Sequence, residues 1–232
     1  MSSIITIGFD ADDTLWKNEH VFKLTEARFT SMLAGHGEAE HISSRLLAAE
    51  RRNLSFYGFG IKGFMLSMIE TAIEVTDGHV PASIIADILA AGREMLRHPV
   101  ETLPGARETL QALAGCYRLV LITKGDLFDQ ERKLAQSGLG ELFDAVEIVS
   151  DKTVSTYQRI FARHGKGAER AMMVGNSLKS DVIPAIEAGS FGVHVPHDLI
   201  WDLEHAEAPV EAERFRRIAH LGELEDLLKQ LS

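Results

Sequence analysis

Hydrophobic and polar positions divide the chain into three stretches with different periods. An apolar, β-rich run from Ile4 to Phe9 ends abruptly in carboxylates, which predicts a buried strand that stops at a turn. Residues 17–99 follow a helical period without a strand-like interruption. After residue 100, short apolar runs alternate with helical patterns, which predicts parallel strands joined by right-handed helical crossovers.

The middle stretch is typical of several amphipathic helices. The helical period is strongest over residues 83–97, where apolar side chains recur on one face. Weaker helical patterns cover residues 19–33, 38–52 and 61–76. We therefore predict a helical cap at 17–99, inserted into an α/β core made of residues 1–16 and 100–232.

Four apolar runs in the last stretch predict further strands. They cover residues 117–123, 145–149, 171–174 and 191–195. Together with the first strand they predict a three-layer α/β fold, in which a doubly wound parallel sheet forms a Rossmann-like core that carries the helical cap. Ligands of such sheets bind beyond the carboxyl ends of the strands, so the residues at these ends are the candidates for chemistry.

Asp10 and Asp12 come directly after the first strand. Residues two apart on an extended chain point to the same side, so both carboxylates can converge on one ligand. Two close carboxylates repel each other unless a cation lies between them. The pair therefore predicts a metal site, or a nucleophile with an acid/base partner, or both; the alternative is an acidic turn that only closes the strand.

The other strand ends supply the remaining groups that phosphoryl transfer requires. Thr123 ends the second predicted strand, Lys152 follows the third, and Asn176 and Asp181 follow the fourth. A hydroxyl can bind a phosphate oxygen, a lysine supplies a compact positive charge, and amide and carboxylate oxygens hold a hard cation. We expect Lys124, next to Thr123, to contact the substrate as well.

The order of these residues resembles the four motifs of the haloacid dehalogenase-like hydrolase superfamily. The matching segments are Asp-x-Asp-x-Thr at 10–14, Leu-Ile-Thr ending at 123, lysine at 152, and Gly-Asn-Ser-x-x-Ser-Asp at 175–181. The helical insertion between the first two motifs resembles the helical cap of one phosphatase branch, so the similarity covers nearly the whole chain.

The resemblance implies a role for each catalytic residue. Asp10 would attack phosphorus and become an aspartyl phosphate, and Asp12 would protonate the leaving alkoxide and later deprotonate water. Thr123 would hold the phosphoryl oxygens, and Lys152 would stabilise the nucleophile and the developing charge.

The resemblance also implies Mg²⁺, bound by Asp10, the main-chain carbonyl of Asp12 and a residue of the last motif. Many relatives have aspartate where this chain has Asn176, whose amide oxygen coordinates a cation without adding charge. Asp181 is either a direct ligand or the group that orients Lys152 and a metal-bound water, and the sequence leaves both open.

The segment 53–64 in the predicted cap contains two glycines separated by Phe59 and followed by Lys62. Such a loop is able to close an active site, so we predict that Phe59 and Lys62 bind the substrate. A plain turn between two helices is the alternative.

Composition narrows the classes of partner. The net charge of −10 argues against non-specific nucleic-acid binding, and no apolar run is long enough to span a membrane. The first residues lack a signal-peptide pattern, and the single cysteine, Cys116, forms no intrachain disulfide, so we expect a cytoplasmic monomer or homodimer. The spacing of the histidines within residues 194–205 matches no metal-binding motif.

These observations predict a Mg²⁺-dependent phosphatase that acts on a small phosphorylated metabolite, such as a nucleotide or sugar phosphate. The Asp-Ala-Asp-x-Thr-Leu start resembles that of pyrimidine nucleotidases. A 2-haloacid dehalogenase is one alternative, but it needs no acid at Asp12. A phosphate-binding regulatory module without turnover and a phosphosugar mutase are the others.

Overall fold

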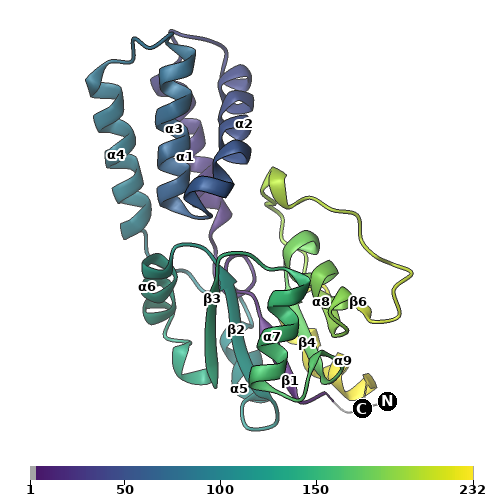
Figure 1. The fold of residues 1–232 in the computed structure, drawn as a ribbon. Coiled ribbons are helices and arrows are strands. Elements are labelled where there is room, and N and C mark those ends of the chain that lie inside the picture. Colours follow the sequence, from purple (N-terminus) through teal and green to yellow (C-terminus); the bar gives the residue numbers. More distant parts are fainter. Residues whose placement is uncertain (1–3, 232) are drawn as a thin grey trace. The chain divides into compact units, whose positions relative to one another are not determined.

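The structure is a computed structural model that describes residues 4–231 (Figure 1). The chain divides into two compact units. The first unit contains the residues up to Lys17, residues 100–124 and the residues from Gln130 onward. The second contains residues 18–99 together with residues 125–129.

The first unit is built on a parallel sheet. In the described part of the chain this sheet has six strands in the order β3-β2-β1-β4-β5-β6, with every neighbouring pair parallel. The strands are β1 (Thr6–Phe9), β2 (Arg118–Lys124), β3 (Ala145–Val149), β4 (Ala171–Gly175), β5 (Phe191–His194) and β6 (Phe215–Arg217). The order reverses at β1, as in a doubly wound sheet, so the predicted α/β fold is confirmed.

Helices cover both faces of the sheet (Figure 1). They are α5 (Ala106–Leu113), α6 (Leu127–Ser137, whose first turn belongs to the second unit), α7 (Val154–His164), α8 (Ile183–Glu187) and α9 (Leu224–Leu231). Ile7 and Phe9 of β1 share one apolar cluster with the leucines of α5 and α9. Val120 and Ile122 of β2 share another with Phe161 of α7. The alternation along each strand therefore places successive side chains in opposite layers.

Gly8 allows the central strand to pack tightly on the α7 side. A Cβ atom at this position would lie 2.7 Å from Cδ1 of Ile122 and 3.0 Å from the sulfur of Met173. The absence of a side chain lets these two neighbours close over β1, and this fixes the strand that ends at Asp10.

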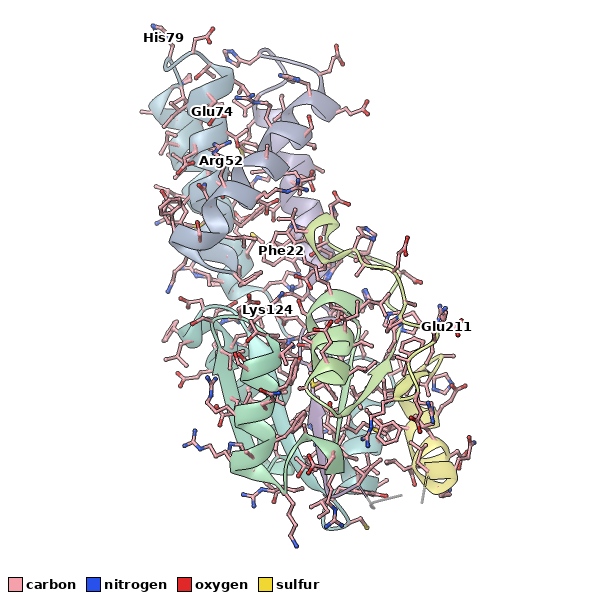
Figure 2. All side chains as sticks on the ribbon, turned by 45° about the vertical axis from the view of Figure 1, so that its right-hand side comes forward. Phe22, Arg52, Glu74, His79, Lys124 and Glu211 are labelled. Atoms are coloured by element: carbon pink, nitrogen blue, oxygen red, sulfur yellow. The ribbon has the colours of Figure 1, made fainter. Side chains whose placement is uncertain are left out.

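The second unit contains four helices joined by short connections, and it has a hydrophobic core of its own. The helices are α1 (Glu19–Met32), α2 (Ala39–Tyr57), α3 (Ile61–Val75) and α4 (Ala82–Arg97). Phe64 and Met68 are buried in this core, as the helical stripe predicts. On its surface Arg52 donates to Glu74 across 2.6 Å, and the two side chains point toward each other in Figure 2.

One strand was not predicted from the sequence. The strand β6 has only three residues, Phe-Arg-Arg, of which two are charged, and it pairs with β5 at the edge of the sheet. A short charged edge strand carries no hydrophobic alternation that would distinguish it from a loop. Among the described helices, none is long and apolar enough to cross a membrane.

Candidate active site

The carboxyl end of β1 leads directly into the candidate site. The Asp10 amide donates to the carbonyl of Val174 at 2.9 Å, which continues the pairing of β1 with β4 for one more residue. A tight turn follows, in which the amide of Leu15 donates to the carbonyl of Ala11 at 2.8 Å. The backbone therefore turns away while the carboxylate of Asp10 stays at the sheet edge. Asp10 is buried, with 6% of its surface exposed.

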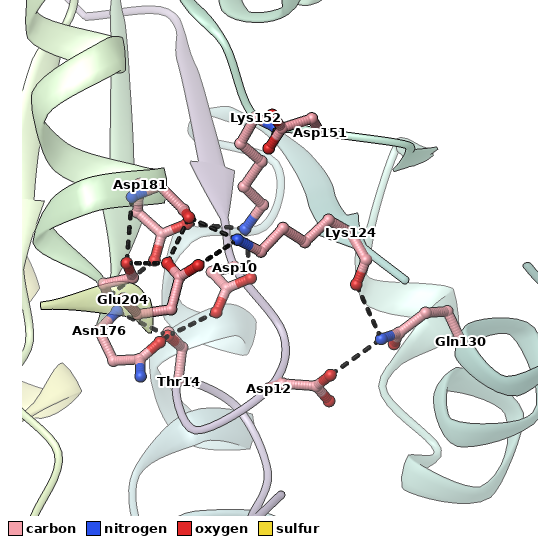
Figure 3. A network of polar contacts seen from close by, with 12 residues as sticks. Asp10, Asp12, Thr14, Lys124, Gln130, Asp151, Lys152, Asn176, Asp181 and Glu204 are labelled. Atoms are coloured by element: carbon pink, nitrogen blue, oxygen red, sulfur yellow. Dashed lines mark hydrogen bonds and ion pairs between the residues drawn. The ribbon is translucent and has the colours of Figure 1, made fainter. Parts of the chain in front are cut away.

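Lys152 joins the two buried aspartates of the site (Figure 3). Its ammonium group donates to Oδ1 of Asp10 in a very short hydrogen bond, and to Oδ1 of Asp181 at 2.7 Å. The second oxygen of Asp181 accepts from the amide of Ser177 at 2.9 Å. Both oxygens of Asp181 are thus bonded within the protein, and one of them holds the ammonium group of Lys152.

A π-type turn at Leu178–Val182 carries Asp181 to this position. The amide of Val182 donates to the carbonyl of Ser177 at 3.2 Å, which is the wide spacing of a π-turn. Gly175 makes the approach possible, because a Cβ atom there would lie 2.3 Å from Oδ2 of Asp181. The sequence predicts a helix from about Lys179, but not the wider first turn.

The electrostatics of this cluster show an excess of negative charge. Burial and the neighbouring Asp181 raise the pKa of Asp10 to about 7, although Lys152 opposes the shift. Burial alone would lower the pKa of Lys152, but the two carboxylates outweigh it and raise that pKa, so the ammonium group stays charged. One cation faces two buried carboxylates, and the nucleophile candidate is therefore poised near neutral pH.

Thr14 brings Asn176 beside Asp10. The Thr14 hydroxyl lies 3.2 Å from Oδ2 of Asp10 and 3.2 Å from Oδ1 of Asn176, and its one proton can go to either. The main-chain amide of Asn176 donates to the same hydroxyl oxygen at 3.0 Å. The predicted ligands Asp10 and Asn176 therefore share a common partner, as Figure 3 shows.

These residues fit a bound Mg²⁺ ion. Within residues 4–231, no group of three or more His, Cys, Asp or Glu side chains is placed to hold a metal ion. The set implied by the motifs is of another kind, one carboxylate (Asp10), one amide (Asn176) and the main-chain carbonyl of Asp12, all hard oxygen donors. A divalent cation would offset the excess negative charge that raises the pKa of Asp10. When bound, it would neutralise charge on a phosphate group.

Asp12 is held apart from this cluster by side chains of α6. Its carboxylate accepts from Lys133 at 2.8 and 3.0 Å, from Gln130 at 2.9 Å, and from Nε1 of Trp16 at 2.7 Å. Burial would raise the pKa of Asp12, but the charge of Lys133 and these hydrogen bonds outweigh burial and lower it. In this structure Asp12 is therefore an ionised, fully bonded carboxylate.

The predicted substrate-binding residues fall into both units. Thr123 is buried at the end of β2. Lys124 donates to Oγ of Ser180 and to Oε1 of Glu204, both at 2.6 Å. In the helical unit, Phe59 is half-buried in the turn between α2 and α3, and Lys62 donates to Asp126 at 2.9 Å.

Sequence reasoning missed Gln130, Lys133 and Glu204. Lys133 is 121 residues from Asp12, and Glu204 is 80 residues from Lys124, so no local spacing joins either pair. One signal in the sequence is the polar pair Gln130 and Lys133, because positions i and i+3 lie on one face of the helix that follows the second motif.

The fold and the site together define a doubly wound α/β protein in which a buried aspartate, held by a lysine, directly follows the first strand. The chain belongs to the haloacid dehalogenase-like hydrolases, whose family model matches residues 4–189. The family named from the motifs is confirmed.

Two curated relatives act on phosphate esters. The chain is 32% identical over 89 residues to the glyceraldehyde 3-phosphate phosphatase of Methanothermobacter thermautotrophicus, a match that covers 36% of this chain and 39% of the relative. It is 30% identical over 132 residues to the pyrimidine 5'-nucleotidase YjjG of Escherichia coli, with 54% and 56% covered. The matches thus span about half or less of each relative's length.

A solved structure matches over nearly the whole chain. It is a haloacid dehalogenase-like family hydrolase from Xanthomonas campestris, 42% identical with a TM-score of 0.88, and the match covers 99% of this chain and 92% of the other. Dehalogenases, among them 2-haloacid dehalogenases, are also among the structural neighbours, at 17–21% identity and TM-scores of 0.63–0.68. At that identity they share the fold alone.

Proposed function

We propose that this protein is a Mg²⁺-dependent phosphatase that hydrolyses a small phosphorylated metabolite through an aspartyl-phosphate intermediate. The observation that carries the proposal is the buried set of Asp10, Lys152 and Asp181, with a second carboxylate, Asp12, two residues after the first. The two curated relatives, a phosphatase and a nucleotidase, support phosphate esters as the substrate class.

The residues divide the reaction into two displacements. In the first, a carboxylate oxygen of Asp10 forms a bond to phosphorus while the bond from phosphorus to the leaving oxygen breaks. Lys152 holds Asp10 in place and offsets the charge that develops. In the second, water attacks the phosphoryl group, the bond to Asp10 breaks, and inorganic phosphate is released with Asp10 restored.

Asp12 is the acid/base candidate in this scheme. Its ionised form, held by Lys133, is ready to take the proton of the attacking water in the second displacement. In the first displacement its protonated form donates to the leaving oxygen, and the proton that it takes from water in the second displacement restores that form. Asp12 also distinguishes the proposal from a haloacid dehalogenase, because a departing halide needs no proton.

The proposed setting follows from composition. The net charge of −10 and the single cysteine support a cytoplasmic enzyme that acts on small molecules without nucleic acid or a membrane, as a monomer or homodimer. An anionic substrate would then rely on Lys152, on Lys124 and on the cation for its attraction to the site.

A substrate panel tests the proposal. The purified protein is assayed against nucleoside monophosphates, sugar phosphates and small phosphate esters with Mg²⁺ and again with EDTA, and against 2-chloropropionate for halide release. We expect phosphate release that requires Mg²⁺ and is lost in Asp10→Asn. Halide release without phosphate release would instead identify a dehalogenase, and neither activity would point to a binding module.

A further inference from the structure

Glu204 belongs to a long irregular segment that returns to the site between β5 and β6. It ends a single turn of 3₁₀ helix, Asp202–Glu204. Lys179 of the π-type turn anchors this segment by donating to the carbonyl of Leu203 at 2.6 Å. The segment is therefore held at the same edge of the sheet as the last motif.

The carboxylate of Glu204 is fully used by groups of the site. Oε1 accepts from Lys124 at 2.6 Å, and Oε2 accepts from the hydroxyl of Ser177 at 2.5 Å and from that of Ser180 in a shorter contact. Its side chain is only 13% exposed, and that of Lys124 is 15% exposed. Burial would raise the pKa of Glu204, but the charge of Lys124 and these hydrogen bonds lower it, so the pair is ionic.

Lys124 lies at the sheet edge where the proposed function requires the phosphate group to bind. It directly follows Thr123 at the end of β2, and in Figure 3 its side chain extends toward Asp10, Asp181 and Glu204. An ammonium group at this place would attract a phosphate dianion. In the structure, however, the carboxylate of Glu204 pairs with the ammonium group of Lys124 and offsets its charge at close range. This ion pair weakens the attraction of Lys124 for a phosphate group.

We infer that Glu204 is a positioning residue that restrains Lys124 and so lowers the affinity of the site for phosphate. The link to turnover rests on the proposed phosphatase function, because a phosphatase must release inorganic phosphate after each cycle. An unrestrained Lys124 would hold that product more tightly. Glu204 lies outside the four motifs. The restraint on Lys124 is therefore a feature of this chain in addition to the residues that the motifs supply for phosphoryl transfer.

The test is the binding of inorganic phosphate to the full-length protein, measured by titration calorimetry in the presence of Mg²⁺. Glu204→Gln keeps the size of the side chain and one acceptor oxygen but removes the charge. We expect its dissociation constant for phosphate to fall about tenfold, equivalent to about 1.4 kcal/mol. Asp226→Asn is the matched control, since it removes one carboxylate from an exposed ion pair with Lys229 on α9 and should leave phosphate binding unchanged.

A double-mutant cycle with Lys124→Met shows whether Glu204 acts through Lys124. The tenfold gain of Glu204→Gln should shrink to less than about threefold in the Lys124→Met background. An equal gain in both backgrounds, or phosphate binding by Glu204→Gln that is unchanged or weaker, would overturn the inference.

A second variant covers the case in which Glu204→Gln does not fold. Glu204→Asp keeps the charge but shortens the side chain by one methylene, which moves the carboxylate away from Lys124. The affinity of this variant for phosphate should lie between those of the wild type and the Gln variant. Unchanged or weaker binding by Glu204→Asp also overturns the inference. Because binding is measured directly, a protein that hydrolyses no phosphate ester yet follows these shifts would refute the proposed function alone.

Discussion

Asp10 combines deep burial with a like charge next to it, and the charge of Lys152 compensates only in part. Its pKa of about 7 means that the folded protein without a metal ion binds a proton at Asp10 more tightly than the unfolded chain does, where the value is near 3.8. The stability gained from that proton is complete below about pH 4 and is lost as the pH rises through about 7. The charge of this candidate nucleophile therefore costs stability at neutral pH.

This cost predicts an effect of Asp10→Asn on stability as well as on activity. Asparagine resembles the protonated acid, keeps an acceptor for Lys152 and has no charge to bury. In EDTA at pH 8 we expect the variant to melt about 2–4 °C above the wild type, equivalent to roughly 1 kcal/mol, and to have essentially no turnover. Thermal melts of both proteins from pH 5 to pH 8 should show the difference shrinking toward pH 5, and a difference that grows on acidification would contradict the assignment.

Asn176 lies near Asp10 through Thr14 and leaves the proposed metal site one charge short of an aspartate version. Hard cations bind more tightly as the ligand charge rises. We expect Asn176→Asp to lower the Mg²⁺ concentration for half-maximal activity roughly tenfold, equivalent to about 1.4 kcal/mol, without a necessary gain in turnover. A Mg²⁺ titration at fixed substrate gives this value for both proteins, and an unchanged or higher half-saturation point would mean that Asn176 is not a ligand.

Asp12 is the second carboxylate whose chemistry a single substitution can isolate. Asp12→Asn keeps the hydrogen bond to Trp16 but removes the proton that a poor leaving group needs. We expect a loss of 100-fold or more, on the order of a general acid's usual contribution, for alkyl phosphates and a much smaller loss of phosphoenzyme formation for aryl phosphates. Burst kinetics with the two ester types make the comparison, and equal losses for both would argue against an acid role.

At the scale of elements, the sequence was most informative where a strand forms an apolar run. The predicted strand at 145–149 has the observed bounds of β3, and the other predicted strands differ from the observed ones by a few residues. The short β6 and the π-type turn were not predictable, because three charged edge residues and one wider turn leave hydrophobic periodicity unchanged. The predicted strand ends were enough to place Asp10 and Lys152 at the same edge of the sheet. The partners of Asp12 and Lys124 could not be predicted, because they come from elements that are distant in the chain.

Gly175 shows how β4 and the π-type turn depend on each other. A methyl group at this position would overlap Oδ2 of Asp181, so Gly175→Ala must displace the carboxylate that orients Lys152. We expect a loss of roughly 1–3 kcal/mol of stability, typical of overpacking, together with a large fall in turnover. Gly35→Ala is the control, since nothing lies within 4 Å of a Cβ atom there. Denaturant unfolding and activity assays compare the two, and equal behaviour would show that the turn adjusts without cost.

At the scale of the whole molecule, the buried apolar residues within 4–231 form three clusters that follow the two units. The helical unit has its own core around Phe29, Ile42 and Met68, and the sheet has a separate cluster on each face. The two lysines that donate to Asp12 and Asp10, Lys133 and Lys152, belong to the sheet unit. We therefore expect the sheet unit to determine the chemistry of the phosphoryl group and the helical unit to discriminate among leaving groups.

The short segment 125–129 is the place where this division is best tested. It belongs to the helical unit, where Lys62 pairs with Asp126, yet along the chain it joins Lys124 to Gln130, the residues that neighbour Thr123 and hold Asp12. Disturbing the Lys62 pair should therefore change how substrates with different leaving groups are ranked.

Lys62→Met and Phe59→Ala test this expectation. We expect both to change the order of kcat/KM among natural phosphate esters by about fivefold or more, a difference of roughly 1 kcal/mol, while the rate on a small aryl phosphate changes little. The control is Arg28→Met, which breaks an exposed ion pair with Glu94 in the same helical unit. If the ranking is the same in all three variants, the segment from Gly58 to Lys62 only connects α2 to α3 and begins that helix. A uniform loss on every ester would instead mean that the pair supports the stability of the helical unit and plays no part in selecting the substrate.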